Sequence, residues 1–497
     1  MNAQLSPTLQ PVSSPCEAIA VAHGDGIGPE IMDAVLHVLR HAAPALRLQP
    51  VAMGHAAYLD GHSTGILPQT WDVLAEHPVL LKGPMTTPQG GGYKSINVTL
   101  RKTLGLYANV RPCVAYHPYV ASPHPGMDVV IIRENEEDTY GGIEHRQTDE
   151  VVQCLKLITR PGCERIVRYA FEYAVAHRRG KVTCMTKDNI MKMTDGLFHR
   201  VFDEIAAEYP QIQAEHRIID IGAARLATRP RDFDVIVTPN LYGDIISDIA
   251  AEIAGSIGLA PSANIGLHGA MFEAVHGSAP DIADKNIANP SGLLLASVQM
   301  LLHIGQANAA QAIHNAWLRT IEDGLHTHDL FNERTSRRRV GTREFAHAVI
   351  ERLGQQPQHL PKVAYDGAPA SATSTRAPAP VRARADKQLE GVDVFLDWNG
   401  QPRDPDELAR RLQAATPAGF RLAVITNRGV KVWPNGHPDT FCTDHWRCRF
   451  KATQGWLDAC RVPELLGRLV EQGFEAVKTE NLYRFGDQAG YSAAQGE

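Results

Sequence analysis

Two aspartates four residues apart form the clearest metal-binding pattern in this 497-residue chain. Asp244 and Asp248 lie in an isoleucine-rich segment with helical spacing. On a helix, residues i and i+4 share one face, so two carboxylates there repel each other unless a cation lies between them. Carboxylate oxygens suit a hard divalent cation. Asp220 is a third candidate ligand, and the alternative for the pair is a solvated helix face.

A second group of residues has the chemistry of a carboxylate-binding pocket. Ser95, Asn97 and Arg101 follow a glycine-rich loop, and Arg111 and Arg133 come after them. A guanidinium binds a carboxylate through two parallel hydrogen bonds. A single arginine is at least as often part of a surface ion pair. Three arginines beside a hydroxyl and an amide indicate a multiply charged carboxylate substrate.

A lysine that follows a predicted buried strand is a candidate acid–base residue. Lys187 comes after the apolar segment 181–185. Burial lowers the pKa of a lysine and makes it a better general base. The alternative is an ordinary surface lysine.

The first of two loops with the composition of a dinucleotide site is rich in glycine. Gly24, Gly26 and Gly28 separate a predicted strand from a predicted helix, where backbone N–H groups can approach a phosphate. Pro29 follows, so the segment is not the Rossmann fingerprint. A purely structural turn is equally consistent with it.

The second loop contains small residues and one carboxylate. His276 and Gly277 begin it, and Asp281 follows. A carboxylate at this place would accept hydrogen bonds from a ribose diol and repel a 2′-phosphate. The loop therefore predicts NAD, rather than NADP, as the coenzyme.

Alternating strands and helices must position these residues. From about Cys16 to Gly354, apolar strand-like runs alternate with helix-like runs, which predicts an α/β fold. The predicted strands are 19–22, 79–81, 128–132, 181–185 and 234–237. The predicted helices include 31–39, 167–176 and 293–306.

A linker and a second globular unit follow. Residues 361–390 are rich in Pro, Ala and Ser and predict a flexible linker. Residues 391–497 show strand, helix, three strands, helix and strand in that order, which predicts a small α+β domain. Cys442, His445 and Cys448 have metal-like spacing, but the strand expected there would place the histidine on the opposite face. We therefore expect these three to be ordinary strand residues.

The composition is that of a globular protein with a sizeable core. Hydrophobic residues make up 44% of the chain, and the net charge of −6 argues against a nucleic-acid binder. The eight cysteines include no C-x-x-C pair and indicate reduced thiols. Residues 1–15 lack the features of a signal peptide, and the apolar stretch 293–304 is too short to span a bilayer. We therefore expect a cytoplasmic protein with no membrane contact.

Taken in order, these groups closely resemble the motifs of the β-decarboxylating dehydrogenases, which act on isocitrate, 3-isopropylmalate, homoisocitrate or tartrate. The resemblance covers roughly residues 16–354. It implies the two-domain fold of isopropylmalate dehydrogenase, with one sheet shared by both domains. Residues 16–104 and 256–360 would form a large cofactor domain, and residues 105–255 a small domain with a dimerisation segment. A homodimer or higher homo-oligomer would share active sites between subunits.

Within this family, Ser95-Ile-Asn97 before Arg101 is similar to the isocitrate dehydrogenases. The tail 391–497 resembles the C-terminal domain of long bacterial isocitrate dehydrogenases, and we expect it to support assembly. Members with Lys-Tyr in place of Asp281-Ile282 are similar to NADP enzymes, so Asp281-Ile282 resembles the NAD type. Some of the long bacterial enzymes use NADP, which is therefore the alternative coenzyme. The expected reaction is oxidative decarboxylation of isocitrate to 2-oxoglutarate. A homoisocitrate or 3-isopropylmalate dehydrogenase and a catalytically silent regulatory subunit are the alternatives.

The resemblance implies a role for each candidate residue. Asp244, Asp248 and the partner subunit's Asp220 would bind Mg²⁺ or Mn²⁺. Lys187 of the partner subunit would help remove the hydroxyl proton, and Tyr140 would protonate the product carbon. The residues expected to hold the tricarboxylate are Ser95, Asn97, Arg101, Arg111, Arg133 and Asn189. Those expected to hold NAD are Gly26, Ile27, Gly28, Thr86, Glu273, His276, Gly277, Asp281, Ile282 and Asn289.

Overall fold

The structure is a computed structural model, which describes residues 18–88, 90, 92–365 and 384–495. The described residues form two compact units. The first comprises residues 18–141 and 156–365, and the second comprises residues 142–155 and 384–495. Most of the predicted linker lies outside the described residues, and its last four residues already belong to a strand that begins at Lys387.

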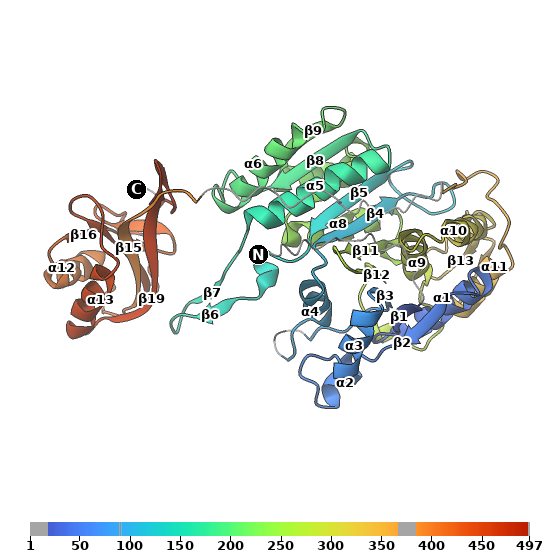
Figure 1. Cartoon of the computed structure of the whole chain (residues 1–497), viewed down its shortest axis with the longest axis horizontal. Coiled ribbons are helices and arrows are strands. Elements are labelled where there is room, and N and C mark those ends of the chain that lie inside the picture. Colours follow the sequence, from blue (N-terminus) through green and yellow to red (C-terminus); the bar gives the residue numbers. More distant parts are fainter. Residues whose placement is uncertain (1–17, 89, 91, 366–383, 496–497) are drawn as a thin grey trace, which may run out of the picture. The chain divides into compact units, whose positions relative to one another are not determined.

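A ten-stranded sheet is the framework of the first unit (Figure 1). Its described strands lie in the order β2-β1-β3-β12-β11-β4-β5-β10-β8-β9. The strands from β2 to β12 are parallel, as are those from β5 to β9. Three antiparallel pairings in the middle join these halves, which therefore run in opposite directions. The strands are β1 (Ala18–Ala22), β2 (Arg47–Pro50), β3 (Val79–Lys82), β4 (Ala108–Val114), β5 (Asp128–Glu134), β8 (Lys181–Thr186), β9 (Gln213–Ile218), β10 (Val235–Thr238), β11 (Pro261–Ile265) and β12 (Ala270–Ala274).

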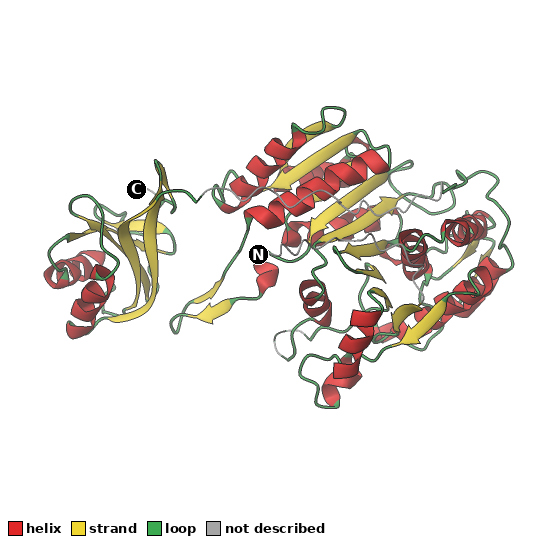
Figure 2. Ribbon diagram, viewed as in Figure 1, coloured by secondary structure: helices red, strands yellow, loops and turns green. Residues whose placement is uncertain are grey.

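Both faces of this sheet are covered by helices, which explains why its central strands are continuous apolar runs (Figure 2). Val130 and Ile132 of β5 pack in the cluster that contains α5, whereas Val129 and Ile131 pack in the cluster that contains α8. Side chains of a strand alternate between its faces, so one strand serves both cores. The helices are α1 (Gly28–Ala42), α2 (His55–Leu59), α3 (Pro68–Glu76), α4 (Ile96–Thr103), α5 (Arg160–Ala176), α6 (Thr194–Ala206), α7 (Ile219–Thr228), α8 (Asn240–Ala254), α9 (Ser291–His303), α10 (Ala307–Glu322) and α11 (Thr342–Ile350).

The predicted helices are present, with different ends. The helix predicted over 293–306 ends at His303, because Gly305 adopts φ of 78°, the left-handed conformation that commonly follows a helix. The short strands β13 (Leu325–His326) and β14 (Arg338–Arg339) pair beside these helices.

The second unit has its own core. A six-stranded antiparallel sheet, in the order β17-β16-β18-β15-β19-β20, packs against two helices through a separate apolar cluster (Figure 1). The hairpin β6–β7 belongs to this unit, because Glu150 pairs with Arg403 at 2.7 Å and Thr148 donates a hydrogen bond to Asp444 at 2.6 Å. The elements are β6 (Glu144–Arg146), β7 (Val152–Cys154), β15 (Lys387–Asp397), α12 (Pro405–Ala415), β16 (Phe420–Asn427), β17 (Val430–Trp433), β18 (His445–Ala452), α13 (Arg461–Glu471), β19 (Glu475–Phe485) and β20 (Gln488–Ala489).

The strand predicted near Cys442 begins later than expected. β18 starts at His445, because the side chain of Asn427 binds the backbone N–H of Thr443 at 2.9 Å and holds this segment outside the ladder. Cys442, His445 and Cys448 form no cluster with metal-ligand spacing among the described residues.

The predicted fold class is confirmed. The first unit is an α/β structure with one large mixed sheet, and the second is the expected small α+β domain. In the part of the chain that the structure describes, no helix is long and apolar enough to cross a membrane.

Candidate active site

Two of the predicted substrate arginines lie side by side against helix α8. Arg111 of β4 and Arg133 of β5 both contact the carboxylate of Asp244, the former at 3.3 Å. Arg111 also donates to Ser247 Oγ at 2.6 Å, and Arg133 donates to Asn240 Oδ1 at 2.9 Å. The antiparallel pairing of β4 with β5 places the two arginines on neighbouring strands beside the helix. Arg111 and Arg133, which are both buried, therefore form one cationic group against α8.

The third arginine is held by a carboxylate that comes from the other half of the sheet. Arg101 of α4 donates to Glu273 Oε1 of β12 at 3.0 Å. Lys82, at the end of the neighbouring strand β3, contacts Glu273 Oε2 at 2.7 Å. All three residues are buried. Glu273, predicted beside the coenzyme, therefore lies under the substrate arginine.

The charges of this buried triad follow from its geometry. Burial raises the pKa of Glu273, but Lys82 and Arg101 outweigh it and hold that pKa far below its usual range. Burial also lowers the pKa of Lys82, and Glu273 only partly offsets the shift while Arg101 adds to it. The carboxylate faces two cations, whereas the ammonium faces one carboxylate. Glu273 is therefore ionised and fixes Arg101.

The predicted substrate pocket contains buried polar atoms without partners among the described residues. These are Arg101 Nε, Arg111 Nε, Arg133 Nη2 and Asn97 Oδ1. An unmet buried donor or acceptor costs about 1–3 kcal/mol. Each arginine thus keeps an N–H available for an incoming anion, such as a carboxylate. Ser95 contacts Thr87 at 3.3 Å, whereas Asn189 is exposed.

The acidic pair lies on the helix that the sequence predicted. Asp244 and Asp248 are on α8, and Arg111 Nη1 lies 3.6 Å from Asp248 Oδ1. Burial raises the pKa of Asp244, but Arg133 and Arg111 outweigh it, so the net shift is downward. The pKa of Asp248 is raised by burial, which Arg111 only partly offsets. Asp244 is therefore ionised at neutral pH, as an oxygen ligand to a cation must be.

Tyr140, the predicted proton donor, lies against this helix. Its hydroxyl donates to Asp244 Oδ2 at 2.5 Å, and the Arg133 guanidinium lies 4.7 Å from its ring centre. Burial is the largest cause that raises the pKa of Tyr140, and the nearby charge of Asp244 adds to it. The phenol therefore stays protonated at neutral pH.

Lys187 and Asp220 pair with each other in a single chain. Lys187 Nζ lies 2.7 Å from Asp220 Oδ2, which is at the start of α7. Among the described residues, Asp220, Asp244 and Asp248 do not form a group of possible metal ligands whose atoms all lie within 4.8 Å of one another. Within one chain, Asp220 therefore does not complete the acidic pair.

The predicted coenzyme loops lie against one another. Ile27 donates its backbone N–H to Ser278 O at 2.8 Å, and Thr86 Oγ1 donates to Ser278 Oγ at 2.9 Å. Gly26 has φ of 58°, and a Cβ there would clash with the Ser278 carbonyl oxygen. The glycine turn is therefore needed for close packing, and the backbone N–H groups of Asp25, Ile27 and Gly28 are bound within the chain. Gly28 begins α1.

The rest of the second loop has mixed surroundings. His276 is half-buried, burial lowers its pKa, and its Nε2 has no partner among the described residues. Asn289 is tied to Asp329 at 2.9 Å and to the backbone of Ser291. A Cβ at Gly277 would meet no atom within 4 Å. Asp281 is exposed, and Ile282 follows it in a short 3-10 helix.

Sequence reasoning missed the partners that hold these loops and the arginine pocket. No sequence pattern assigns a role to Lys82, although a charged residue at the end of a wholly buried strand must find a partner. Ser278 and Lys285 stand in a segment that the sequence singled out, but their roles depend on contacts. Arg343 is distant in sequence. Only the folded chain brings it near, since its backbone N–H donates to Asn286 Oδ1 at 3.1 Å.

Comparison with known proteins supports the family. The isocitrate/isopropylmalate dehydrogenase family matches residues 18–349, and the bacterial isocitrate dehydrogenase C-terminal domain matches residues 387–497. A Rickettsia bellii protein named "Isocitrate dehydrogenase [NADP]" is 53% identical over 96% of this chain and 99% of its own length. A Thermus thermophilus protein of the same name is 43% identical over 96% of both chains. The crystal structure of the TT0538 protein from Thermus thermophilus has a TM-score of 0.90 and 41% identity, covering 97% of this chain and 96% of that one.

The prediction of NAD is wrong. Relatives that match almost the whole chain are named NADP enzymes, whereas an Arabidopsis thaliana relative named for NAD matches only 66% of it. The prediction rested on the one carboxylate of Asp281. In the structure, Lys285 Nζ lies 2.7 Å from the carbonyl oxygen of Asp281, and Asn286 ties the loop to Arg343. Lys285 thus places one cation beside the loop of Asp281, and Arg343 reaches the same loop through its backbone N–H.

The fold, and the site residues that it brings together, agree with the family matches, which cover both units of the chain. The chain therefore belongs to the isocitrate/isopropylmalate dehydrogenase family, in the long bacterial isocitrate dehydrogenase form with an additional C-terminal domain.

Proposed function

We propose that this protein oxidises and decarboxylates isocitrate to 2-oxoglutarate and CO₂, with NADP⁺ as the hydride acceptor and Mg²⁺ or Mn²⁺ as the metal. The observation that carries the proposal is the set of three buried guanidiniums with unpartnered N–H groups beside the acidic pair of α8. A tricarboxylate supplies several anionic groups for these donors. The names of the relatives along the full chain support the choice of substrate and coenzyme.

The binding residues act as charge partners of the substrate. Arg101, Arg111 and Arg133 hold its carboxylates, and Glu273 keeps Arg101 in place. Ser95, Asn97 and Asn189 provide the additional polar contacts that distinguish isocitrate. A substrate with an alkyl group in place of this carboxylate would leave Asn97 Oδ1 and the Ser95 hydroxyl without partners. The pocket therefore favours isocitrate over 3-isopropylmalate.

The acidic pair fits a hard divalent cation. Asp244 and Asp248 present oxygens on one face of α8, and Asp244 is ionised. A cation held there would polarise the substrate hydroxyl and stabilise the negative charge that develops when CO₂ leaves. Asp220 of the partner subunit is the third ligand in this proposal, because Asp220 of the same chain lies elsewhere.

The proton transfers use two residues. Lys187 of the partner subunit takes the proton of the C2 hydroxyl, and bound NADP⁺ would supply the acceptor for the hydride of C2. After CO₂ leaves, Tyr140 donates its proton to the substrate carbon that carried the lost carboxylate. The raised pKa of Tyr140 suits this role, because the phenol must be protonated before the step.

A second copy of the chain is the expected partner. Ile221 of α7 and Ile245 of α8 are each 53% exposed, and Ile190 beside Lys187 is 67% exposed. These apolar side chains lie close in sequence to Asp220, Asp244 and Lys187. A homodimer that covers them would bring Lys187 and Asp220 of the partner subunit to the acidic pair.

The coenzyme lies along the two packed loops in this proposal. Gly26, Ile27 and Gly28 with Thr86 approach the pyrophosphate, and His276, Gly277, Ile282 and Asn289 surround the adenosine half. We assign Lys285 and Arg343 to the 2′-phosphate, because the Lys285 ammonium contacts the loop of Asp281 and the backbone of Arg343 is hydrogen-bonded to Asn286 of the same loop.

The test is a comparison of kcat/KM for NADP⁺ and NAD⁺ with isocitrate, homoisocitrate and 3-isopropylmalate in the presence of Mg²⁺. We expect isocitrate with NADP⁺ to be preferred by about a hundredfold, roughly 2.7 kcal/mol of transition-state stabilisation. Preference for another hydroxy acid would overturn the substrate. No turnover by the pure homo-oligomer would favour a regulatory subunit.

A further inference from the structure

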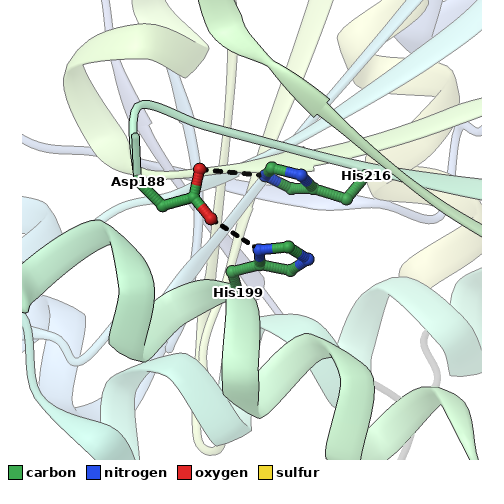
Figure 3. A group of neighbouring side chains, drawn as sticks. All are labelled: Asp188, His199 and His216. Carbon is green, nitrogen blue, oxygen red and sulfur yellow. Dashed lines mark hydrogen bonds and ion pairs between the residues drawn. The ribbon is translucent and has the colours of Figure 1, made fainter. Parts of the chain in front are cut away.

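A cluster of two histidines and one aspartate contains none of the residues assigned to substrate, coenzyme or the oxygen metal site, although its aspartate stands between Lys187 and Asn189 in the sequence. Asp188 follows β8, His199 lies on α6, and His216 lies on β9 (Figure 3). His199 Nδ1 is 2.7 Å from Asp188 Oδ2, and His216 Nε2 is 3.9 Å from Asp188 Oδ1. One carboxylate thus faces two imidazoles through its two oxygens.

The cluster has the dimensions of a metal site that needs only a small contraction. One ligand atom from each residue lies within 4.8 Å of the other two. Around a tetrahedral zinc ion with Zn–N bonds of about 2.0–2.1 Å, neighbouring ligand atoms are roughly 3.4 Å apart. The two rings are stacked with centroids 3.5 Å apart, so binding of one ion by both requires the rings to rotate about their χ2 angles.

The three side chains are partly buried, which favours ordered ligands with one side open to solvent. Their side chains are 21%, 26% and 16% exposed for Asp188, His199 and His216. His216 Nε2 also lies 2.9 Å from Thr186 Oγ1, a contact that a metal ion bound to this nitrogen would replace. A fourth ligand would be water.

The charges of the cluster leave room for a cation. Burial, followed by the neighbouring His199, lowers the pKa of His216, because two stacked rings cannot easily both be charged. Burial raises the pKa of Asp188, but the hydrogen bond from His199 and the charge of His216 outweigh it. Asp203 adds a carboxylate 3.7 Å from His199 Nε2. Across the described residues, no lysine or arginine forms an ion pair with Asp188, so the cluster combines carboxylate oxygens and imidazole nitrogens without a lysine or arginine partner.

We propose that Asp188, His199 and His216 bind a borderline transition-metal ion of the Zn²⁺ class. Imidazole nitrogen selects Zn²⁺, Co²⁺, Ni²⁺ and Cu²⁺ over Mg²⁺, whereas the oxygens of Asp244 and Asp248 suit Mg²⁺. The chain therefore carries two metal sites with different preferences. This site joins β9 and α6 to the turn that follows β8, and it does not depend on the proposed reaction.

The experiment uses the full-length protein in a large excess of Mg²⁺, which occupies the oxygen site. Equilibrium dialysis then measures Zn²⁺ bound per chain for the wild type, His199→Asn and His216→Asn. His177→Asn is the matched control, because His177 also stacks on a ring but has no carboxylate partner among the described residues. We expect one Zn²⁺ per chain in the wild type and in His177→Asn, and at least a 10- to 100-fold weaker affinity in the other two variants.

Two outcomes would overturn the proposal. One is equal Zn²⁺ binding by all four proteins, which would indicate adventitious surface binding. The other is a wild-type Co²⁺ complex that shows only the weak absorption of an octahedral, oxygen-bound ion. The Co²⁺ spectrum needs no variant, so it decides the matter even if His199→Asn or His216→Asn folds poorly.

Discussion

Replacing Glu273 by Gln tests whether this carboxylate holds the arginine pocket together. Lys82 and Arg101 contact its two oxygens at 2.7 and 3.0 Å, and all three side chains are buried. Removing one partner of a buried ion pair costs about 3–5 kcal/mol, because the remaining charge has no solvent and no counter-ion. We therefore expect Glu273→Gln to lower the free energy of unfolding by about this amount in urea denaturation at pH 7. The matched control is Glu208→Gln, an exposed ion pair with Arg168 worth about 0–1 kcal/mol.

The loss of unfolding free energy in Glu273→Gln should depend on pH in one direction. The pKa of Glu273 in the folded protein lies far below its usual value, which is about 4.3 for an unfolded chain. Its stabilising contribution is therefore complete above that usual value and is lost as the pH falls toward the folded-state pKa. We expect the difference in unfolding free energy between the wild type and Glu273→Gln to shrink below about pH 4. A loss under 1 kcal/mol at pH 7, or one that does not change with pH, would refute the reasoning.

Three further predictions concern the proposed reaction. Tyr140→Phe should lower kcat by about 10²–10⁴-fold with a much smaller change in the KM for isocitrate, since it removes a proton donor; an unchanged kcat in steady-state assays would exclude Tyr140 as the acid. Lys285→Ser combined with Arg343→Ser should raise the KM for NADP⁺ by about tenfold or more, roughly 1.4 kcal/mol, and leave the KM for NAD⁺ unchanged; equal effects on both coenzymes would argue against a contact with the 2′-phosphate. Lys187→Met and Tyr140→Phe subunits, unfolded and refolded together, should recover about a quarter of wild-type activity, because half the dimers are mixed and each has one intact site. No recovery beyond the separately refolded variants would place Lys187 and Tyr140 of one site in the same chain.

The sequence predicted those parts of the site that depend on residue type and local spacing. Asp244 and Asp248 lie on one helix, as their separation indicated. Arg133 follows the predicted strand 128–132, whereas the strand that carries Arg111, β4, was not predicted, so the meeting of the two arginines depends on the pairing of β4 with β5. The position of Glu273 was less predictable, since its contact with Arg101 depends on the pairing of β12 with β3. Lys82 was missed for the same reason.

The coenzyme prediction failed because it treated one side chain as decisive. A 2′-phosphate responds to the sum of nearby charges, and the loop of Asp281 is bordered by Lys285 in sequence and by Arg343 in space. The second of these contacts spans 57 residues between Asn286 and Arg343. The cluster of Asp188, His199 and His216 shows the same limit, since its members come from a turn, a helix and a strand with no shared period.

The opposite directions of the two sheet halves explain why distant segments meet at this site. β5 and β10 run parallel, so Arg133 at the end of one strand lies beside the start of α8, which follows the other. β3 and β12 run the other way and bring Lys82 and Glu273 together beneath α4. The antiparallel strands β11 and β4 join the halves, and Asn264 of β11 donates to Glu273 while it accepts from Asn109 of β4. A buried polar chain thus links the two halves through the middle of the sheet, so a substitution at Asn264 would disturb Arg101 without touching the substrate.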